Sequence, residues 1–432
     1  MQNRQPAIKD FDNLEFKMPY LINSEAGIPI YVYDGEKIEV CRVDVIFFSG
    51  SYNEEVTLTA QTTAELITEA TLKKSSSIFT ELIDFYGGWI TKCCAKHFTT
   101  FTLYAPVRTY KKLLPLFFEA ISSPRFSKRD LERYKRQLIE GMKVNKKKVD
   151  VISSEIFRKQ LFGSHPYGVT PQPDNCNALN NEILKEFHNK WFYASNCNVV
   201  ISGAVTDDMV NMLQKELLRI PQKEHITPNK IAIDNNISET LFVKEVVNAM
   251  QSSVRIGARV INNDNADHYK LQIVNTALGG YFGSRLSKNI REEKGYTYGI
   301  YSGILALPDA AHFMILSQTG INFTKPLIKE AEKEIIRIKE EPIPNYELTS
   351  LKGYMLGSYA RMFDTRFTLA DAFLSLLTSY KTLSNKEIDF KDIFNKRINE
   401  IKSITANTIL ETAQKYLPDY TDMITVVAGK FQ

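Results

Sequence analysis

The chain has 432 residues, more than one ordinary hydrophobic core organises, and this length matches two domains of about 200 residues each. Hydrophobic residues make up 44% and charged residues 24%, which is typical of a globular protein with little long disorder. Lys and Arg number 54 against 50 Asp and Glu, and the charges are spread along the chain. This balance argues against a nucleic-acid-binding protein and against a protein held on an acidic membrane by charge.

The sequence carries no visible targeting or membrane segment. No stretch has the roughly 18 consecutive apolar residues of a membrane span. The first thirty residues lack the basic start and apolar core of a signal peptide. The cysteines are odd in number and form no CxxC pair, which indicates reduced thiols. We therefore expect a cytoplasmic protein; a trimmed form of an exported precursor would instead be periplasmic.

The first informative element is the stretch "TTAELITEATLKKSS", which follows the buried strand "VDVIFFSG". Its pattern predicts a helix over residues 62–73. Glu65 and Glu69 lie one turn apart on that helix, and Lys73 lies one turn further on. Three interpretations are open: a catalytic or metal-binding pair of carboxylates, a solvated charge ladder, or the remains of a former site.

Histidine and cysteine ligands for a metal are sparse. No two of the six histidines lie within five residues of each other, and no HExxH or HxxEH motif occurs. In "CCAKH", strand alternation places Cys93 and His97 on one face and Cys94 on the other. A buried thiol beside a partly exposed histidine explains that motif better than two ligands do. His165, in "SHPYG", is typical of turn chemistry.

An internal repeat organises the chain. Residues 182–205 align without a gap on residues 408–431, so that Val200 falls on Val426 and Gly203 on Gly429. Each copy predicts an amphipathic helix, a turn and a buried strand that ends on glycine. A second repeat relates "VDVIFFSGSYNEE" and helix 58–73 to "SSVRIGARVINND" and helix 267–278. We predict two similar, duplicated α+β domains at 1–220 and 239–432, joined by a polar, proline-containing linker at 221–238.

The segment "NIREEKGYTYGIYSG" carries the most interesting polar pair. The spacing of apolar residues predicts a helix up to about Lys294, with Gly295 as a left-handed C-cap. A strand follows, with Tyr296, Tyr298 and Ile300 predicted on one face. Arg291 and Tyr298 would then converge as a donor pair for a peptide carbonyl or a carboxylate. The alternative is that Arg291 pairs with a neighbouring acid.

Together these stretches resemble the insulinase and pitrilysin family of inverzincin peptidases, which includes the mitochondrial processing peptidase. The resemblance covers nearly the whole chain, and "LGGYFGSRLSKNIREEKGYTYGIYSG" is its most specific part. It implies that each half is a mostly antiparallel sheet packed with helices. It also implies two such halves forming one wall of a chamber that encloses a peptide, with a second wall opposite.

The resemblance further implies that this chain has lost its metal site. Peptide-cutting members carry His-x-x-Glu-His on the helix of the first domain, and a later glutamate completes the zinc shell. The matching positions here hold Glu65, Thr68 and Glu69, and neighbouring registers supply no histidine. Glu140 lies roughly where the third ligand is expected, but one carboxylate does not rebuild the site. We expect no metal in this chain and a vestigial helix whose glutamates form a solvated ladder with Lys73.

The second motif of the family is retained, because Arg291 and Tyr298 show its spacing of seven residues. The resemblance implies a substrate-binding subunit, inactive alone, that lends this pair in trans to a zinc-bearing homologue in a heterodimeric peptidase. One alternative is a scaffold or docking protein without proteolysis, for which a homodimer would suffice. Another is an active peptidase with the unusual ligands Glu65, Glu69 and Cys93.

Overall fold

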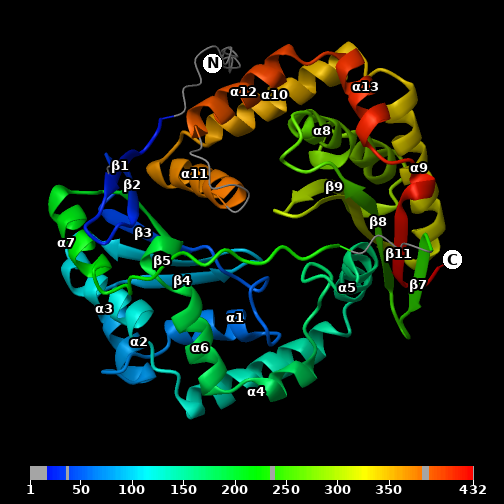
Figure 1. Ribbon diagram of the computed structural model, residues 1–432. Coiled ribbons are helices and arrows are strands. Elements are labelled where there is room, and N and C mark those ends of the chain that lie inside the picture. Colours follow the sequence, from blue (N-terminus) through cyan, green and yellow to red (C-terminus); the bar gives the residue numbers. More distant parts are fainter. Residues whose placement is uncertain (1–16, 36–37, 234–238, 382–388, 432) are drawn as a thin grey trace, which may run out of the picture.

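The structure is a computed structural model that describes residues 17–35, 38–233, 239–381 and 389–431. Two halves, each a sheet with its helices, face each other (Figure 1). The start of the chain and the linker residues 234–238 lie outside the described residues. Among those described, no helix combines the length and the apolar character that a membrane crossing requires.

The first half contains a six-stranded sheet in the order β1-β2-β6-β3-β5-β4. Only β2 and β6 pair in parallel; the other neighbours are antiparallel. The strands are β1 (Tyr20–Asn23), β2 (Pro29–Tyr33), β3 (Val40–Phe47), β4 (Trp89–Cys94), β5 (Thr99–Pro106) and β6 (Cys197–Gly203). The helices are α1 (Thr59–Ile67), α2 (Ser76–Phe85), α3 (Tyr110–Ser122), α4 (Lys128–Asn145), α5 (Val149–Phe162), α6 (Asn181–Trp191) and α7 (Asp207–Leu217), with short 3-10 helices η1 (Pro173–Ala178) and η2 (Ala194–Asn196).

The second half contains a five-stranded sheet in the order β7-β11-β8-β10-β9, with only β7 and β11 parallel. Its strands are β7 (Leu241–Glu245), β8 (Gln251–Val260), β9 (Thr297–Ala306), β10 (Ala311–Gly320) and β11 (Ile424–Gly429). Its helices are α8 (His268–Asn275), the π-helices η3 (Thr276–Gly280) and η4 (Ser287–Glu293), α9 (Thr324–Glu340), α10 (Asn345–Arg361), α11 (Arg366–Lys381), α12 (Phe390–Ser403) and α13 (Ala406–Tyr416), with short 3-10 helices η5 (Ile321–Phe323) and η6 (Tyr420–Asp422).

The predicted repeat is present in three dimensions. Helix α6 leads into β6 as α13 leads into β11, and the two sheets share one strand order apart from the extra edge strand β1. The side chain of Asn180 caps α6 by accepting from Ile183 N (2.9 Å), and Thr405 caps α13 by accepting from Thr408 N (3.1 Å). Both strands end on a glycine with positive φ, 101° and 130°. The predicted α+β fold with two similar halves is confirmed.

Each half lends one helix to the sheet of the other half. Along β6, Val199 and Ile201 pack into the core of the first half, whereas Val200 faces the opposite side, where α11 covers the sheet. Along β11, Val427 packs into the core of the second half, whereas Val426 contacts the α5 cluster. Alternation along a strand sends neighbouring residues to opposite faces, so each sheet is buried on both sides. The domain boundaries at 220 and 239 remain a prediction, since packing crosses between the halves twice.

A buried ion pair fixes α11 on the first sheet. Arg42 Nε on β3 lies 2.8 Å from Asp44 Oδ2, and its Nη2 lies 2.6 Å from Asp371 Oδ1 on α11. The hydroxyl of Thr102 donates to the other oxygen of Asp44 at 2.7 Å. Both charges of the strand are almost fully buried, so they need these partners to offset the loss of hydration.

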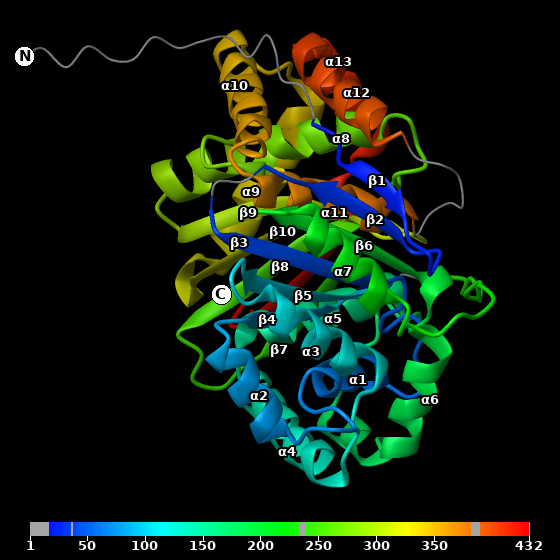
Figure 2. The same ribbon diagram turned by 90° about the vertical axis from the view of Figure 1, so that its left-hand side faces the viewer.

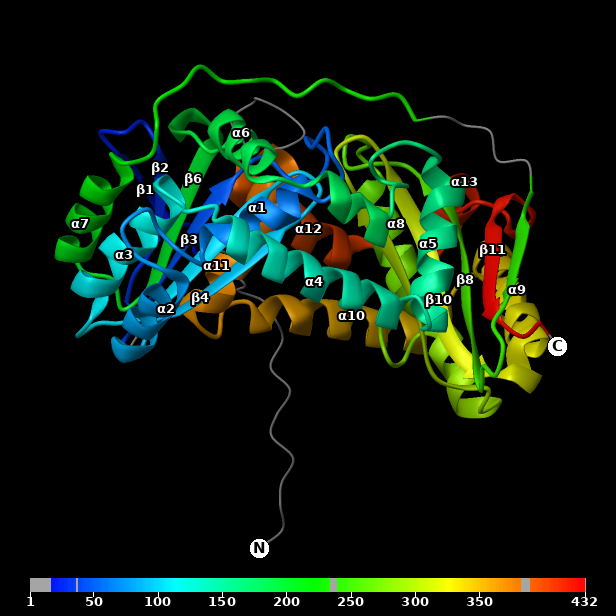
Figure 3. The same cartoon turned by 90° about the horizontal axis from the view of Figure 1, so that it is seen from below.

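The connection between the halves runs along the outside. Residues 219–233 cross from α7 toward the second half (Figure 3). The hydroxyls of Tyr193 and Tyr52 accept from the backbone N–H groups of Ile226 (2.8 Å) and Ile231 (3.0 Å), which holds this segment against the first half. Helices α10, α12 and α13 lie at the end of the molecule opposite α2 and α4 (Figure 2).

Candidate functional site

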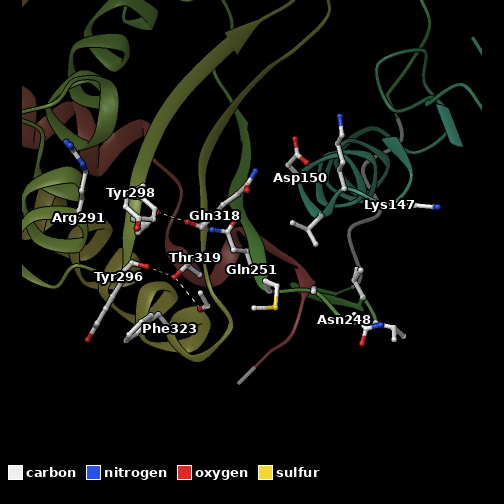
Figure 4. A pocket seen from close by; sticks show the side chains of 18 of the residues that line it. Lys147, Asp150, Asn248, Gln251, Arg291, Tyr296, Tyr298, Gln318, Thr319 and Phe323 are labelled. Carbon is white, nitrogen blue, oxygen red and sulfur yellow. Dashed lines mark hydrogen bonds between the residues drawn. The ribbon is translucent and has the colours of Figure 1, made fainter. Parts of the chain in front are cut away.

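A cavity of about 990 Å³ lies between the start of α5 and the outer strands of the second sheet. Residues 147–150, 246–251, 295–298 and 318–320 line it, together with Arg291 and Phe323. Figure 4 shows Arg291 and Tyr298 on one side, with Lys147 and Asp150 on the other. The two residues singled out from the sequence therefore face one cavity.

Arg291 projects from the π-helix η4, which is anchored to the core and to α9 by its neighbours Ile290 and Asn289. Ile290 is fully buried, and Asn289 Nδ2 donates to Glu334 Oε1 (2.8 Å) and Glu330 Oε2 (3.2 Å) on α9. Gly295 ends the segment with φ 65°, as predicted for a left-handed C-cap. The guanidinium carbon of Arg291 lies 4.1 Å from the ring centroid of Phe282.

The guanidinium of Arg291 has no carboxylate partner among the described residues. It lies instead over the ring of Phe282. The alternative interpretation, a simple ion pair with a neighbouring acid, is therefore not what the structure has. Its N–H donors remain available to an acceptor that enters the cavity.

Tyr298 is presented by a β-bulge. Thr297 pairs with Thr319 but Ile300 pairs with Ser317, so Tyr298 and Gly299 together oppose a single residue of β10. The prediction that Tyr298 and Ile300 share a face is therefore wrong, because the extra residue breaks the alternation. Ile300 is buried, whereas Tyr298 is 95% exposed.

Hydroxyl groups hold the bulge open. Thr297 Oγ1 donates to the carbonyl of Gln318 at 2.6 Å, and Ser317 Oγ donates to the carbonyl of Gly299 at 2.9 Å. These bonds occupy backbone groups that the irregular pairing would otherwise leave unsatisfied. A phenol and a guanidinium thus lie along one cavity wall, and neither has an acidic partner within the described part of the chain. Each is a donor for a carbonyl or carboxylate that enters the cavity.

The helix expected over residues 62–73 is shorter than predicted. It begins at Thr59, where the carboxylate of Glu54 accepts from the N–H groups of Leu58 and Ala60 (both 3.0 Å), and it ends at Ile67. Glu69 and Lys73 lie beyond its C-cap, in a segment where Thr71 forms a bridge to Pro124. The predicted ladder of Glu65, Glu69 and Lys73 is therefore wrong, because no common helix carries the three.

Other cations neutralise the two glutamates. Lys92 Nζ on β4 lies 2.7 Å from Glu65 Oε2, and Arg133 Nη2 on α4 lies 2.6 Å from Glu69 Oε2. Sequence reasoning missed both partners, since each is remote along the chain from its glutamate. For Glu65 the sequence did offer one signal, because Lys92 is a charged residue on the strand β4 that packs against α1.

Between α1 and α4, the two helices that could hold a metal, lies a neutral pair of side chains. Gln61, one turn before Glu65, donates from Nε2 to the hydroxyl of Tyr134 on α4 at 3.2 Å. Burial, with the charge of Glu65, raises the pKa of that hydroxyl, so it stays protonated. Glu140 pairs instead with Lys143 (2.8 Å) and is 69% exposed.

Within the described part of the chain, no three His, Cys, Asp or Glu side chains are grouped to bind a metal. The donor set of amide, phenol, ammonium and carboxylate does not fit zinc, which takes imidazole or thiolate. The unusual ligand set of Glu65, Glu69 and Cys93 is not brought together either, since Cys93 is exposed and both glutamates are paired.

Comparison with known proteins supports the resemblance seen in the sequence. A family model described as "Peptidase M16 inactive domain" matches residues 178–354, the region that includes Arg291 and Tyr298. Over these residues the chain is similar to the peptidase M16 inactive domain. The resemblance to the inverzincin peptidases is thereby confirmed.

Relatives and solved structures agree with this similarity. The chain is 21% identical over 342 residues to an uncharacterized zinc protease YmxG of Bacillus subtilis, covering 77% of this chain and 81% of that protein. It is 27% identical over 248 residues to a non-peptidase homolog YmxG of Helicobacter pylori, 56% of each chain. A peptidase M16 inactive domain from Pseudomonas fluorescens superposes with a TM-score of 0.84 at 21% identity, covering 96% and 98% of the two chains. The fold is that of the M16 proteins.

The other histidines singled out from the sequence have structural surroundings. His97 Nε2 and the hydroxyl of Tyr167 lie 2.6 Å apart, and that hydroxyl also donates to Asp309 Oδ2 in the second half (3.3 Å). His165 turns the chain between α5 and η1, as the turn prediction implied. The prediction of a buried Cys93 beside His97 is wrong, because Cys93 is exposed on the edge strand β4.

Stability should fall as the pH drops below about 6.5, because burial lowers the pKa of several histidines, most strongly those of His97 and His312. Burial lowers the pKa of His97 to about 4, and burial beside Arg158 and Arg255 lowers the pKa of His312 to about 4. Between pH 6.5 and 4 these two histidines are protonated in the unfolded chain but not in the folded chain. Each therefore lowers the free energy of unfolding by up to about 1.4 kcal/mol per pH unit over that range. His312→Phe should flatten this decline in thermal melts between pH 7 and 5, while His225→Gln in the exposed linker should leave it unchanged. Identical slopes in all three proteins would contradict the assignment.

Proposed function

We propose that this chain is a non-catalytic, substrate-binding subunit of a heterodimeric zinc metallopeptidase that degrades or processes peptides. It supplies Arg291 and Tyr298 in trans, and the zinc belongs to a homologous partner subunit. The observation that carries the proposal is the pair itself. A 95% exposed tyrosine on a bulge and an arginine line one cavity, and among the described residues the arginine has no acidic partner. Nor do the described residues of the first half group three metal donors together.

The maintenance of this arrangement supports a binding role. An exposed aromatic ring on an irregular strand adds nothing to core packing, and a π-helix is less favourable than a regular helix. Irregular elements of this kind concentrate at functional sites. The Helicobacter pylori relative is named a non-peptidase homolog, in agreement with loss of the cutting function and retention of the fold.

The chemistry follows from the two donors. Arg291 would donate from its guanidinium N–H groups, and Tyr298 from its phenolic O–H, to the carbonyl oxygen of the peptide bond to be cut. Both donors favour the transition state because negative charge grows on that oxygen. The activated water would come from the partner's zinc. The chain alone then binds peptide and leaves it intact.

Reconstitution tests the proposal. The purified chain is mixed with a homologue that carries His-x-x-Glu-His, and cleavage of a quenched fluorescent peptide library is measured. Restored cleavage is expected, and Tyr298→Phe should lower kcat/KM by about 10-fold or more through loss of one donor. Tyr301→Phe is the matched control, since Tyr301 is exposed on the same strand but does not line the cavity, and it should leave the rate unchanged. Association without cleavage would support the scaffold alternative and would overturn the role in trans.

A further inference from the structure

The ammonium group of Lys92 lies where α1, β4 and α4 meet. Its three contacts are Glu65 Oε2 at 2.7 Å, Thr68 Oγ1 at 3.2 Å and the backbone carbonyl of Glu65 at 3.3 Å. An ammonium has three N–H donors, and three acceptors are present. The Lys92 side chain is 24% exposed and that of Glu65 33%, so the pair is largely shielded from water.

The three acceptors surround the cation as ligands would surround a bound ion. They come from the last turn of α1 and its C-cap, where unsatisfied carbonyl oxygens and the negative end of the helix dipole favour positive charge. The neighbouring pair of Gln61 and Tyr134 is neutral and internally hydrogen bonded. The cluster is therefore complete in charge without any added ion.

A second cation closes the adjoining position. Arg133 Nη2 lies 2.6 Å from Glu69 Oε2 and 3.6 Å from Asp130 Oδ1, and Ser76 Oγ also donates to Glu69 at 3.2 Å. Glu69 is thus oriented toward α4 and α2 by other groups. A divalent ion entering between α1 and α4 would meet fixed positive charge on both sides.

We propose that Lys92 is a built-in cation that replaces the metal in this half of the molecule. Its ammonium takes up the negative charge of Glu65, holds the C-terminal end of α1 against the edge strand β4, and excludes divalent ions by charge and by occupancy. This proposal does not depend on the proposed peptidase partner, because it concerns the chain by itself.

Metal binding tests the exclusion. Because Glu69 lies beyond the end of α1, a metal site is built instead where Gln61, one turn before Glu65, contacts Tyr134 of α4 (3.2 Å). Two full-length variants are compared: one carries Gln61→His, Glu65→His and Tyr134→Glu, and the other adds Lys92→Ala. Cobalt and zinc titrations followed by calorimetry should give binding at least about 10-fold tighter when Lys92 is removed, because a like charge at the site opposes the ion. Lys143→Ala, an exposed lysine on α4, is the matched control and should not change the affinity of the triple variant. Equal affinities with and without Lys92 would overturn the proposal, as would near-stoichiometric zinc in the natural chain purified without chelator.

A stability cycle tests the clamp and does not require the triple variant to fold. Lys92→Met and Glu65→Gln should each lower Tm by roughly 2–4 °C, and the double variant should lose less than the sum of the two. Lys143→Met with Glu140→Gln, an exposed pair of the same residue types, should show no coupling. Additive losses for Lys92 and Glu65 would contradict the clamp, and chelator should leave Tm of the natural chain unchanged.

Discussion

Replacing Arg291 by alanine should lower kcat/KM of the reconstituted peptidase by about 10² to 10³, the usual effect of removing one donor to a developing oxyanion. The guanidinium lines the cavity and pairs with no carboxylate of the described residues, so the change removes hydrogen bonds to substrate and leaves the ion pairs described above intact. Most of the loss should appear in kcat, because the donor acts mainly on charge that develops during reaction. Cleavage rates at saturating peptide give kcat, and rates at limiting peptide give kcat/KM, so the two effects can be separated.

Three controls make the result specific. Arg291→Lys keeps the charge but loses the planar fork of donors, so we expect it to recover only part of the rate. Arg361→Ala on α10 removes an exposed arginine that donates to Ser358 Oγ (3.0 Å), and it should have no effect. Unchanged Tm of Arg291→Ala would show that its loss of rate does not arise from unfolding. A rate within twofold of the natural chain would refute the proposed role.

The largest loss of stability should follow from Phe373→Ala on α11. The ring is fully buried, and its centroid lies 4.7 Å from those of Tyr31 on β2 and Phe390 on α12, and 6.0 Å from that of Tyr33. Truncating a phenylalanine in such a core costs about 3–5 kcal/mol through lost burial and the cavity left behind. The site joins the two halves, so the loss should appear in the unfolding of both.

Urea unfolding followed by fluorescence and circular dichroism measures this effect. Ser375→Ala, an exposed position on the same helix, should stay within about 0.5 kcal/mol of the natural chain. If Phe373→Ala lost less than about 1 kcal/mol, α11 would not be an essential cover of the first sheet. Separate transitions for the two halves would show that the exchanged helices do not couple them.

Much of the fold was accessible from the sequence, because duplication leaves the same pattern twice. The alignment of Val200 on Val426 and of Gly203 on Gly429 placed two equivalent strands, and both strands occupy the same position in their sheets. Gly295 was predicted as a left-handed cap on local spacing alone, and local spacing determines such caps. Periodic and local features were therefore the reliable part.

Features that depend on distant contacts were not accessible. The early end of α1 at Ile67 and the partners Lys92 and Arg133 are set by packing against β4 and α4. The bulge at Tyr298 depends on the register with β10, which the sequence of β9 alone does not encode. The exchange of α5 and α11 could not be predicted either, because the sequence of each helix does not indicate which of the two sheets it packs against.

The exchange of α5 and α11 bears on how such a chain could have arisen. A half-length ancestor with this topology would leave one face of its sheet bare unless a second copy lent its helix. Two such polypeptides would then be interlocked from the start, and joining their genes would convert a concentration-dependent association into an intramolecular one. On this view the fused chain inherited the reciprocal packing of α5 and α11 from a domain-swapped dimer. The outer connection at residues 219–233 is then the linker that joined the two copies.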